Sequence, residues 1–229
     1  MGVQSDKFVA ETDEFDLENA PEAGAPLAKS GWAAAEESAA GSNDFPEDFK
    51  LTETEQLVKF IDTEGPAAVY KLHFFENKKG RKGYACLGQN CPLCAEFTDS
   101  KMKPSDKYVF TVAEVKRVKE EVDGKEVWVT KVTRKKLTGG IRLYKTLREA
   151  DSSSAGPLHK PLWTIKKSGA GATVLYHPSP VKLRDLEEDF SIDPAFVASE
   201  LEEIKPYDKA ELVQEVSRET LLEVVKELS

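Results

Sequence analysis

The sequence predicts a mainly β protein with flanking helices (α+β), built around a small OB-fold-like barrel. Three observations predict this class. Between residues 67 and 184, short runs rich in β-branched and aromatic residues alternate with turn residues, which is typical of a small antiparallel sheet. All three cysteines fall between residues 86 and 94. Both ends of the chain are acidic and its middle is basic.

The first 66 residues are predicted to contain an N-terminal arm and the start of the core. Residues 1–44 are rich in Ala, Glu, Gly, Ser and Pro, so they are predicted to form a disordered acidic N-terminal arm. The run LTETEQLVKFID (51–62) predicts a helix, since Thr52 and Glu55 fit a capping box and apolar residues follow at helical spacing. Gly65 and Pro66 would end this helix.

The core, residues 45–184, is predicted mostly as strands. They are expected at 68–75, 83–87, 106–118, 126–137, 162–169 and 172–184. Asp123-Gly124 predicts a tight hairpin between the third and fourth of these runs, and Gly169 to Gly171 a second hairpin. With one helix predicted at 139–150, five to six strands favour an OB-fold, which is a five-stranded, partly open barrel.

The remaining residues, 185–229, are predicted to be an acidic helical region. Helices are expected at 193–204 and 208–228, with a break near Ser217, a plausible N-cap. The apolar stripe of the last helix consists of Leu221, Leu222, Val225 and Leu228. Such a stripe packs on the protein's own core or on a partner.

Charge is distributed unevenly along the 229 residues, although the net charge is −9. Residues 1–50 carry 12 acidic and 3 basic side chains, residues 51–184 carry 15 and 25, and residues 185–229 carry 14 and 4. A basic middle with acidic ends predicts a core that binds a polyanion. No apolar run approaches the roughly 20 residues that span a bilayer, so no membrane partner is expected.

His73, Cys86, Cys91 and Cys94 form a set with the spacing of metal ligands. Zinc takes four nitrogen or sulfur ligands in a tetrahedron, and pairing of 68–75 with 83–87 would bring His73 close to Cys86. We therefore predict one structural Zn²⁺ in a subdomain of about residues 67–105. Alternatives are a different fourth ligand, such as His159 or His177, or three buried and unconnected cysteines. The odd number of cysteines argues against a disulfide framework and favours a reducing cytosol.

Aromatic and basic residues interleave on the predicted strands, as single-strand binding requires: bases stack on exposed rings while a basic groove follows the phosphates. Trp128, Arg134 and Lys136 share one strand face by the period of two. The predicted nucleic-acid contacts are Lys78, Lys79, Arg81, Lys82, Tyr84, Tyr108, Arg117, Trp128, Arg134, Lys136, Arg142, Lys145, Trp163, Lys167 and Tyr176.

No constellation of catalytic residues is evident, and the chain is not expected to be an enzyme. It has no Walker-type glycine loop and no HExxH motif. Two alternatives to single-strand binding stay open. One is a zinc-containing protein-interaction or transcription-regulatory module, and the other is a metal-dependent nuclease built from paired carboxylates.

The order of His73, Cys86, Cys91 and Cys94 resembles that in bacteriophage single-stranded DNA-binding proteins of the T-even helix-destabilising type. The gap between Cys86 and Cys91 is shorter than in that type. The fuller run from FPEDFKLTETEQLVKFID through YACLGQNCPLC and YVFTV to VLYHPSPVKLRDLEEDF is similar to related proteins of actinobacterial phages, over about residues 31–229.

This resemblance implies a protein that coats and protects single-stranded DNA in phage DNA replication, recombination and repair, in the cytoplasm of a bacterial host. It also implies that the acidic C-terminal region contacts replication or recombination proteins. The T-even type uses a basic N-terminal arm for cooperative binding, whereas residues 1–30 here are acidic. Self-association on DNA would then involve another segment, such as the one around Trp32.

Overall fold

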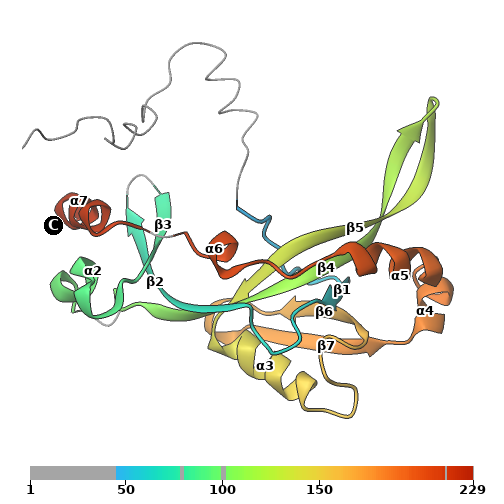
Figure 1. Cartoon of the computed structure of the whole chain (residues 1–229), viewed down its shortest axis with the longest axis horizontal. Helices are drawn as coiled ribbons and strands as arrows, with labels where there is room; N and C mark the ends of the chain where they lie inside the picture. Colours follow the sequence, from blue (N-terminus) through green and yellow to red (C-terminus); the bar gives the residue numbers. More distant parts are fainter. Residues whose placement is uncertain (1–44, 78–79, 99–101, 215, 229) are drawn as a thin grey trace, which may run out of the picture. The chain divides into compact units, whose positions relative to one another are not determined.

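A computed structural model describes residues 45–77, 80–98, 102–214 and 216–228, so the predicted N-terminal arm lies outside the described residues. The strands are β1 (Gln56–Phe60), β2 (Ala68–Asn77), β3 (Gly80–Ala85), β4 (Ser105–Val122), β5 (Lys125–Gly139), β6 (Leu162–Ser168) and β7 (Leu175–Val181). The helices are α2 (Pro92–Glu96), α3 (Ile141–Asp151), α4 (Leu183–Glu188), α5 (Pro194–Glu203), α6 (Lys209–Leu212) and α7 (Arg218–Leu228). This α+β composition agrees with the predicted class (Figure 1).

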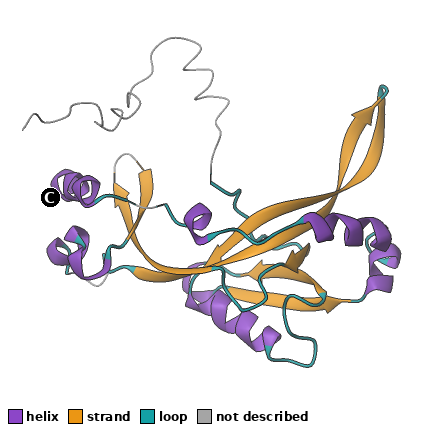
Figure 2. Ribbon diagram, viewed as in Figure 1, coloured by secondary structure: helices purple, strands orange, loops and turns teal. Residues whose placement is uncertain are grey.

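The strands form one open antiparallel sheet in the order β3-β2-β4-β1-β6-β7, with β5 on the other edge of β4 (Figure 2). The strand β4 has 18 residues and links the parts of this sheet. Its residues 108–122 pair with β5 along one edge. On the opposite edge, residues 105–109 pair with β2 and residues 112–115 pair with β1. Two strands therefore lie end to end beside one continuous strand.

The junction between β2 and β1 on this edge is closed by Asp62. Its Oδ2 accepts the backbone N–H of Thr111 at 2.6 Å, and the N–H of Ile61 donates to the Thr111 carbonyl at 3.0 Å. The backbone groups of Thr111 are thus satisfied where neither strand reaches them. Burial raises the pKa of the Asp62 carboxyl to about 6, although the hydrogen bonds from Thr111 oppose this rise.

The hairpin turn at Asp123 and Gly124 fixes the register of β4 with β5. Both residues have positive φ, 52° and 73°, as the two central positions of a type I′ turn require. The ladder then runs without a bulge from Val122–Lys125 to Tyr108–Gly139. Beyond Val115, β4 and β5 pair with each other and with no other described strand, so the end of this hairpin extends past the sheet (Figure 1).

Alternating side chains of β4 enter three apolar clusters, one on one face of the sheet and two on the other. Phe110 and Val112 pack with Leu143 and Leu147 of α3. On the other face, Val115 packs with Leu186 of α4 and Val197 of α5, while Val109 packs with Leu212 of α6. The acidic C-terminal region therefore covers the face of the sheet that α3 leaves open.

The predicted helix at 51–62 is wrong, because this segment contains the strand β1. β1 lies between β4 and β6, so Leu57 faces the cluster of the C-terminal helices while Val58 and Phe60 face the α3 cluster. A strand that is buried on both faces has no alternation of apolar and polar residues. Its short apolar run therefore cannot be told from a buried helix by periodicity.

Most of the other predicted elements are confirmed with shifted ends, but the helix expected from residue 208 ends at Leu212, and α7 begins only at Arg218. The helices α2 and α4 were not predicted. The break near Ser217 is also confirmed, since its Oγ accepts the N–H of Thr220 at 3.1 Å as an N-cap. In α7 the buried residues are Leu221 and Val224, whereas Leu222 is 36% exposed, so the stripe on this helix is rotated from the predicted one. Among the described residues, no helix is long and apolar enough to cross a membrane.

The junction of β5 with α3 requires a glycine at position 139. A Cβ there would fall 2.8 Å from the Cβ of Leu143 and closer still to its Cδ2. We expect Gly139→Ala to lower the free energy of unfolding by about 1–3 kcal/mol because the packed Leu143 must shift. Gly140→Ala is the matched control, since a Cβ there meets nothing within 4 Å. Urea denaturation of both variants measures the difference, and equal losses would contradict the steric explanation.

The raised pKa of Asp62 predicts a pH dependence. The folded carboxyl titrates at about 6 against its ordinary value of 3.8, so the folded state binds this proton more tightly. Stability from this group is therefore present at low pH and declines as the pH rises through 6. We expect wild type to gain up to about 1 kcal/mol relative to Asp62→Asn between pH 7 and pH 5, after allowance for partial solvent exposure. Urea denaturation of both proteins at each pH tests this, and a constant difference would contradict it.

Candidate metal centre and charged surfaces

Four potential metal ligands come from the β2–β3 hairpin and the turn that follows it. His73 on β2 lies opposite Tyr84 on β3. Cys86 comes directly after β3, where its N–H donates to the Lys71 carbonyl at 2.8 Å. Cys91 precedes the first residue of α2, and Cys94 lies within α2. A hairpin and a single helical turn therefore bring all four side chains to one place.

The ligand atoms of His73, Cys86, Cys91 and Cys94 all lie within 4.8 Å of one another. The Nε2 of His73 is 3.4 Å from the sulfur of Cys91 and 3.4 Å from that of Cys94. The sulfurs of Cys86 and Cys94 are 3.5 Å apart, and no disulfide joins them. This set could bind one metal ion, as the spacing of these residues predicted.

The orientation of His73 suits a ligand. Its Nδ1 lies 3.1 Å from the carbonyl oxygen of Met102, so Nδ1 carries the proton and donates it, while Nε2 faces the sulfurs with its lone pair. The ring is fully buried and stacks parallel to that of Phe75, with centroids 6.0 Å apart. Burial lowers the pKa of His73, which favours the neutral imidazole that binds a metal.

The three thiols differ in their surroundings. Burial, together with the neighbouring Cys86, raises the pKa of Cys94 to about 12. Burial also acts to raise the pKa of Cys91, but hydrogen bonds with the backbone at Leu87 and Cys94 hold this pKa below its ordinary value. Three adjacent thiolates repel one another, so a divalent cation is the group that would let all of them ionise together.

The C-terminal helix completes this part of the molecule. Leu221 and Val224 of α7 pack with Phe75, Cys91 and Leu93 in one apolar cluster. The metal subdomain is thus built from residues 68–98 together with α7, which lies more than a hundred residues further along the chain. The other two histidines lie outside the cluster, and Nε2 of His177 is 2.8 Å from Oγ of Ser168.

The predicted nucleic-acid contacts fall into several groups. Arg117 and Trp128 lie on the extended end of the β4–β5 hairpin, with the Trp128 side chain 56% exposed. Lys82 is exposed on β3, in the hairpin that carries the candidate metal ligands. Tyr84, on the same strand, packs against the apolar cluster of Phe75 and Leu93. Lys78 and Lys79 lie outside the described residues, and of Arg81 only the backbone, in β3, is described.

Arg134 and Lys136 share a strand face with Trp128, as predicted, and both contact other parts of the chain, although Arg134 stays exposed. The Arg134 guanidinium stacks 3.9 Å from the ring centroid of Tyr207, and its Nη1 donates to the carbonyl of Lys205. Lys136 pairs with Asp48 at 3.6 Å. The acidic C-terminal region therefore contacts the inner half of this face, while the segment before β1 runs beside the edge of β5 at Lys136. Neither contacts Trp128 at the outer end of the face in the described residues.

The remaining predicted contacts lie around α3 and β6–β7. Arg142 and Lys145 are exposed on α3, while Lys167 and Tyr176 are paired across β6 and β7 and are half-buried. Tyr108 is also half-buried and stacks on Tyr144 with centroids 4.3 Å apart. Trp163 is 1% exposed in the α3 cluster, and its Nε1 donates to the Leu158 carbonyl, so its ring has no free face for a base.

Two residues contribute to these sites without having been predicted from the sequence. Lys119 lies opposite Trp128 in the ladder, with its Nζ 5.6 Å from the ring centroid. The tight turn at Asp123-Gly124 contains this signal, because a two-residue turn fixes which residues face each other. The carbonyl of Met102 that orients His73 carries no comparable signal, since any residue could provide it.

Comparison of the chain with protein-family models finds no match, and no curated protein or solved structure matches it either. Fold and site together define an α+β protein with an open antiparallel sheet and one candidate metal centre of three cysteines and one histidine.

We expect the purified protein to contain about one metal ion per chain and His73→Ala to lose it. The unfolding temperature should then fall by about 5 °C or more, which corresponds to roughly 2 kcal/mol for a chain of this size. His177→Ala is the control, because His177 lies outside the cluster. Elemental analysis and thermal denaturation with and without a chelator give the two readouts. A wild type that is equally stable without metal would exclude a structural role.

Proposed function

We propose that this chain is a zinc-stabilised single-stranded DNA-binding protein that acts without catalysis. The observation that carries this proposal is the exposed ring of Trp128 between two cations. The guanidinium of Arg117 lies 5.3 Å from the ring centroid and the ammonium of Lys119 lies 5.6 Å from it. An aromatic face beside positive charge can stack on a base and attract the adjacent phosphate.

Single strands suit this arrangement better than a duplex does, because their bases are free to leave the stack. The Trp128 ring stands on a two-stranded hairpin end that pairs with no further strand among the described residues, and its side chain is exposed. Ring stacking is tolerant of sequence since every base has a π-face. A protein that coats strands of any sequence requires this tolerance.

The order of strand pairing supports an OB-fold as the core. In that fold the first strand pairs with the second and fourth, the second with the third, and the fourth with the fifth. Here β1 pairs with β4 and β6, β4 with β5, and β6 with β7, while α3 follows the third strand of this set. In the described residues β5 does not pair with β7, which leaves the barrel open.

If this correspondence holds, the β2–β3 hairpin with its candidate metal centre lies beside the DNA-binding surface of the OB-fold. The β2–β3 hairpin lies in the connection between β1 and β4, the first and second strands of the proposed OB-fold. Oligonucleotides bind OB-folds across the second and third strands and the first connection. Trp128 on β5 and Lys82 on β3 both belong to these regions.

Zinc is the ion that the candidate metal centre fits best. Ideal tetrahedral zinc bonds imply about 3.8 Å between two sulfurs and about 3.5 Å between sulfur and nitrogen. The distances found are 3.5 Å and 3.4 Å. Four protein ligands close the coordination shell, so this zinc would hold the subdomain together and leave no position for a substrate. An iron–sulfur cluster would require a fourth cysteine.

The setting follows from this proposal together with the sequence resemblance. The protein would protect transient single strands in phage replication, recombination and repair within the bacterial cytoplasm. The acidic C-terminal region, with Phe196 38% exposed on α5, would contact replication or recombination proteins. Neighbouring copies of the protein would associate with one another along the DNA strand.

Trp128→Ala tests the proposal directly. We expect it to weaken binding of a labelled 20-nucleotide single strand about tenfold, because base stacking on an aromatic ring contributes on the order of 1–3 kcal/mol. Val127→Ala is the matched control, since Val127 is exposed on the opposite face of the same strand. Fluorescence anisotropy at two salt concentrations measures the affinity and its decrease with salt.

The same titration, run with magnesium, separates the other function classes. Binding that falls steeply with salt, with preference for single strands over a duplex and an intact oligonucleotide, supports the proposal. Equal binding of both forms would contradict it. Strand cleavage that depends on magnesium would indicate a nuclease, and negligible DNA affinity would indicate a protein-interaction module.

A further inference from the structure

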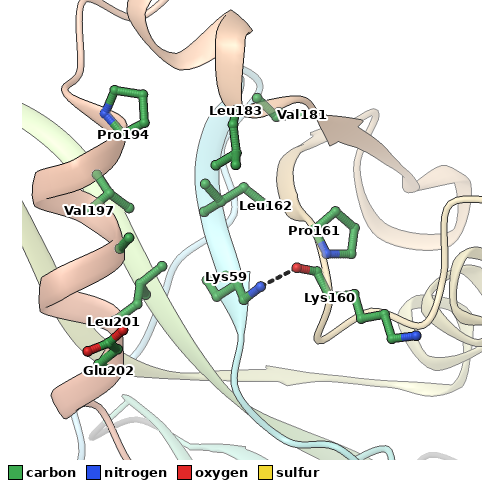
Figure 3. Close-up of a pocket in the computed structure, with 11 residues that line it drawn as sticks. Lys59, Lys160, Pro161, Leu162, Val181, Leu183, Pro194, Val197, Leu201 and Glu202 are labelled. Carbon is green, nitrogen blue, oxygen red and sulfur yellow. Dashed lines mark hydrogen bonds between the residues drawn. The ribbon is translucent and has the colours of Figure 1, made fainter.

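A groove lies between α5 and the start of β6, on the face of the sheet that the C-terminal helices cover (Figure 3). Its volume is about 360 Å³. The apolar side chains that line it are Pro161, Leu162, Val181, Leu183, Pro194, Val197, Ala198 and Leu201. Leu183 is 66% exposed at the rim, although leucine side chains are usually buried. The groove therefore presents apolar surface to solvent.

One lysine reaches into this apolar groove. The Nζ of Lys59, on the central strand β1, donates a hydrogen bond to the Lys160 carbonyl (Figure 3). An ammonium has three donors, and the structure gives one of them a partner among the described residues. Glu202 also lines the groove, yet no described carboxylate lies within 4 Å of this Nζ.

The surroundings of Lys59 make its charge costly. Burial lowers the pKa of Lys59, and no neighbouring anion opposes that effect. A half-buried cation without an anionic partner is stabilised by any ligand that brings a negative charge to it. The apolar walls add a second requirement, because the same ligand must fill them with hydrocarbon.

We propose that this groove binds the free carboxyl terminus of a partner protein whose last residue has an aliphatic side chain. In such a residue the carboxylate and the side chain leave the same Cα, so both fit within one short groove. The carboxylate takes the free donors of Lys59, and the side chain packs between Leu162 and Leu201. The volume lies at the lower end of the range for ligand sites, which suits one residue rather than a long chain.

This site is separate from the proposed DNA contacts. Lys59 is on the central strand β1 and α5 packs over the sheet, whereas Trp128 stands on the hairpin end beyond it. The groove could therefore bind the carboxyl terminus of a partner protein while single-stranded DNA is bound at Trp128. The inference goes beyond DNA binding and does not depend on it, so either can fail without the other.

Two peptides that differ by one charge test the inference. The probes are fluorescein-Gly-Ser-Gly-Ser-Leu with a free carboxyl terminus and the same peptide with an amidated terminus. We expect the free acid to bind the full chain at least tenfold more tightly than the amide, as measured by fluorescence anisotropy. Lys59→Met retains the methylene stem but lacks the ammonium, so it should weaken binding of the acid about tenfold and leave that of the amide unchanged.

Matched variants control for the fold and for nearby charge. Lys160 also lines the groove, but in Figure 3 its side chain points away from Lys59, and Lys160→Met retains the backbone carbonyl, so acid binding should be unchanged. Ala198→Phe fills the groove from α5 and should weaken both peptides. Equal affinity of acid and amide, or no binding of either at millimolar concentration, would overturn the proposal. Self-association that Lys59→Met abolishes, without peptide binding, would assign the groove to a second copy and also overturn it.

Discussion

The continuous ladder of β4 with β5 is the constraint on which the rest of this structure depends. One strand of 18 residues pairs along one edge with β5 and along the other with β2 and then β1. The β2–β3 hairpin with the candidate metal ligands, the central strands and the exposed end of the β4–β5 hairpin are therefore parts of one hydrogen-bonded sheet. Asp62 satisfies the backbone of Thr111 where the paired strands meet, and the turn at Asp123 and Gly124 fixes the register of β4 with β5.

The metal subdomain shows how a small unit can be held without a large core. Its hairpin and single-turn helix bury few apolar residues, chiefly Phe75 and Leu93, and two side chains of α7 complete the cluster. A bound ion would add the free energy that this cluster lacks. Because α7 comes from the far end of the chain, the acidic C-terminal region stabilises the subdomain as well as carrying charge.

The fold shows where the basic residues of the middle of the chain lie relative to the acidic C-terminal region. The acidic C-terminal region lies on the basic sheet, where Tyr207 stacks on the guanidinium of Arg134. The outer end of the same face carries Arg117, the exposed ring of Trp128 and Lys119, which pairs with Glu126. Because Arg134 already stacks on Tyr207, the proposed DNA contacts concentrate on the hairpin end. The helix α5 of the same region forms one wall of the groove beside Lys59.

The sequence by itself determined the features that depend on near neighbours in the chain. The ligand set of His73 with three cysteines, the two hairpins and the break at Ser217 all follow from spacing and turn chemistry. Tertiary structure decided what distant segments do to one another. It made residues 56–60 a central strand, because burial on both faces leaves no periodic signal, and it buried Trp163 in the core. It also stacked Tyr207 on Arg134 and placed no carboxylate of the described residues beside the Lys59 ammonium, since a strand pattern gives the face of a residue but not what packs on that face.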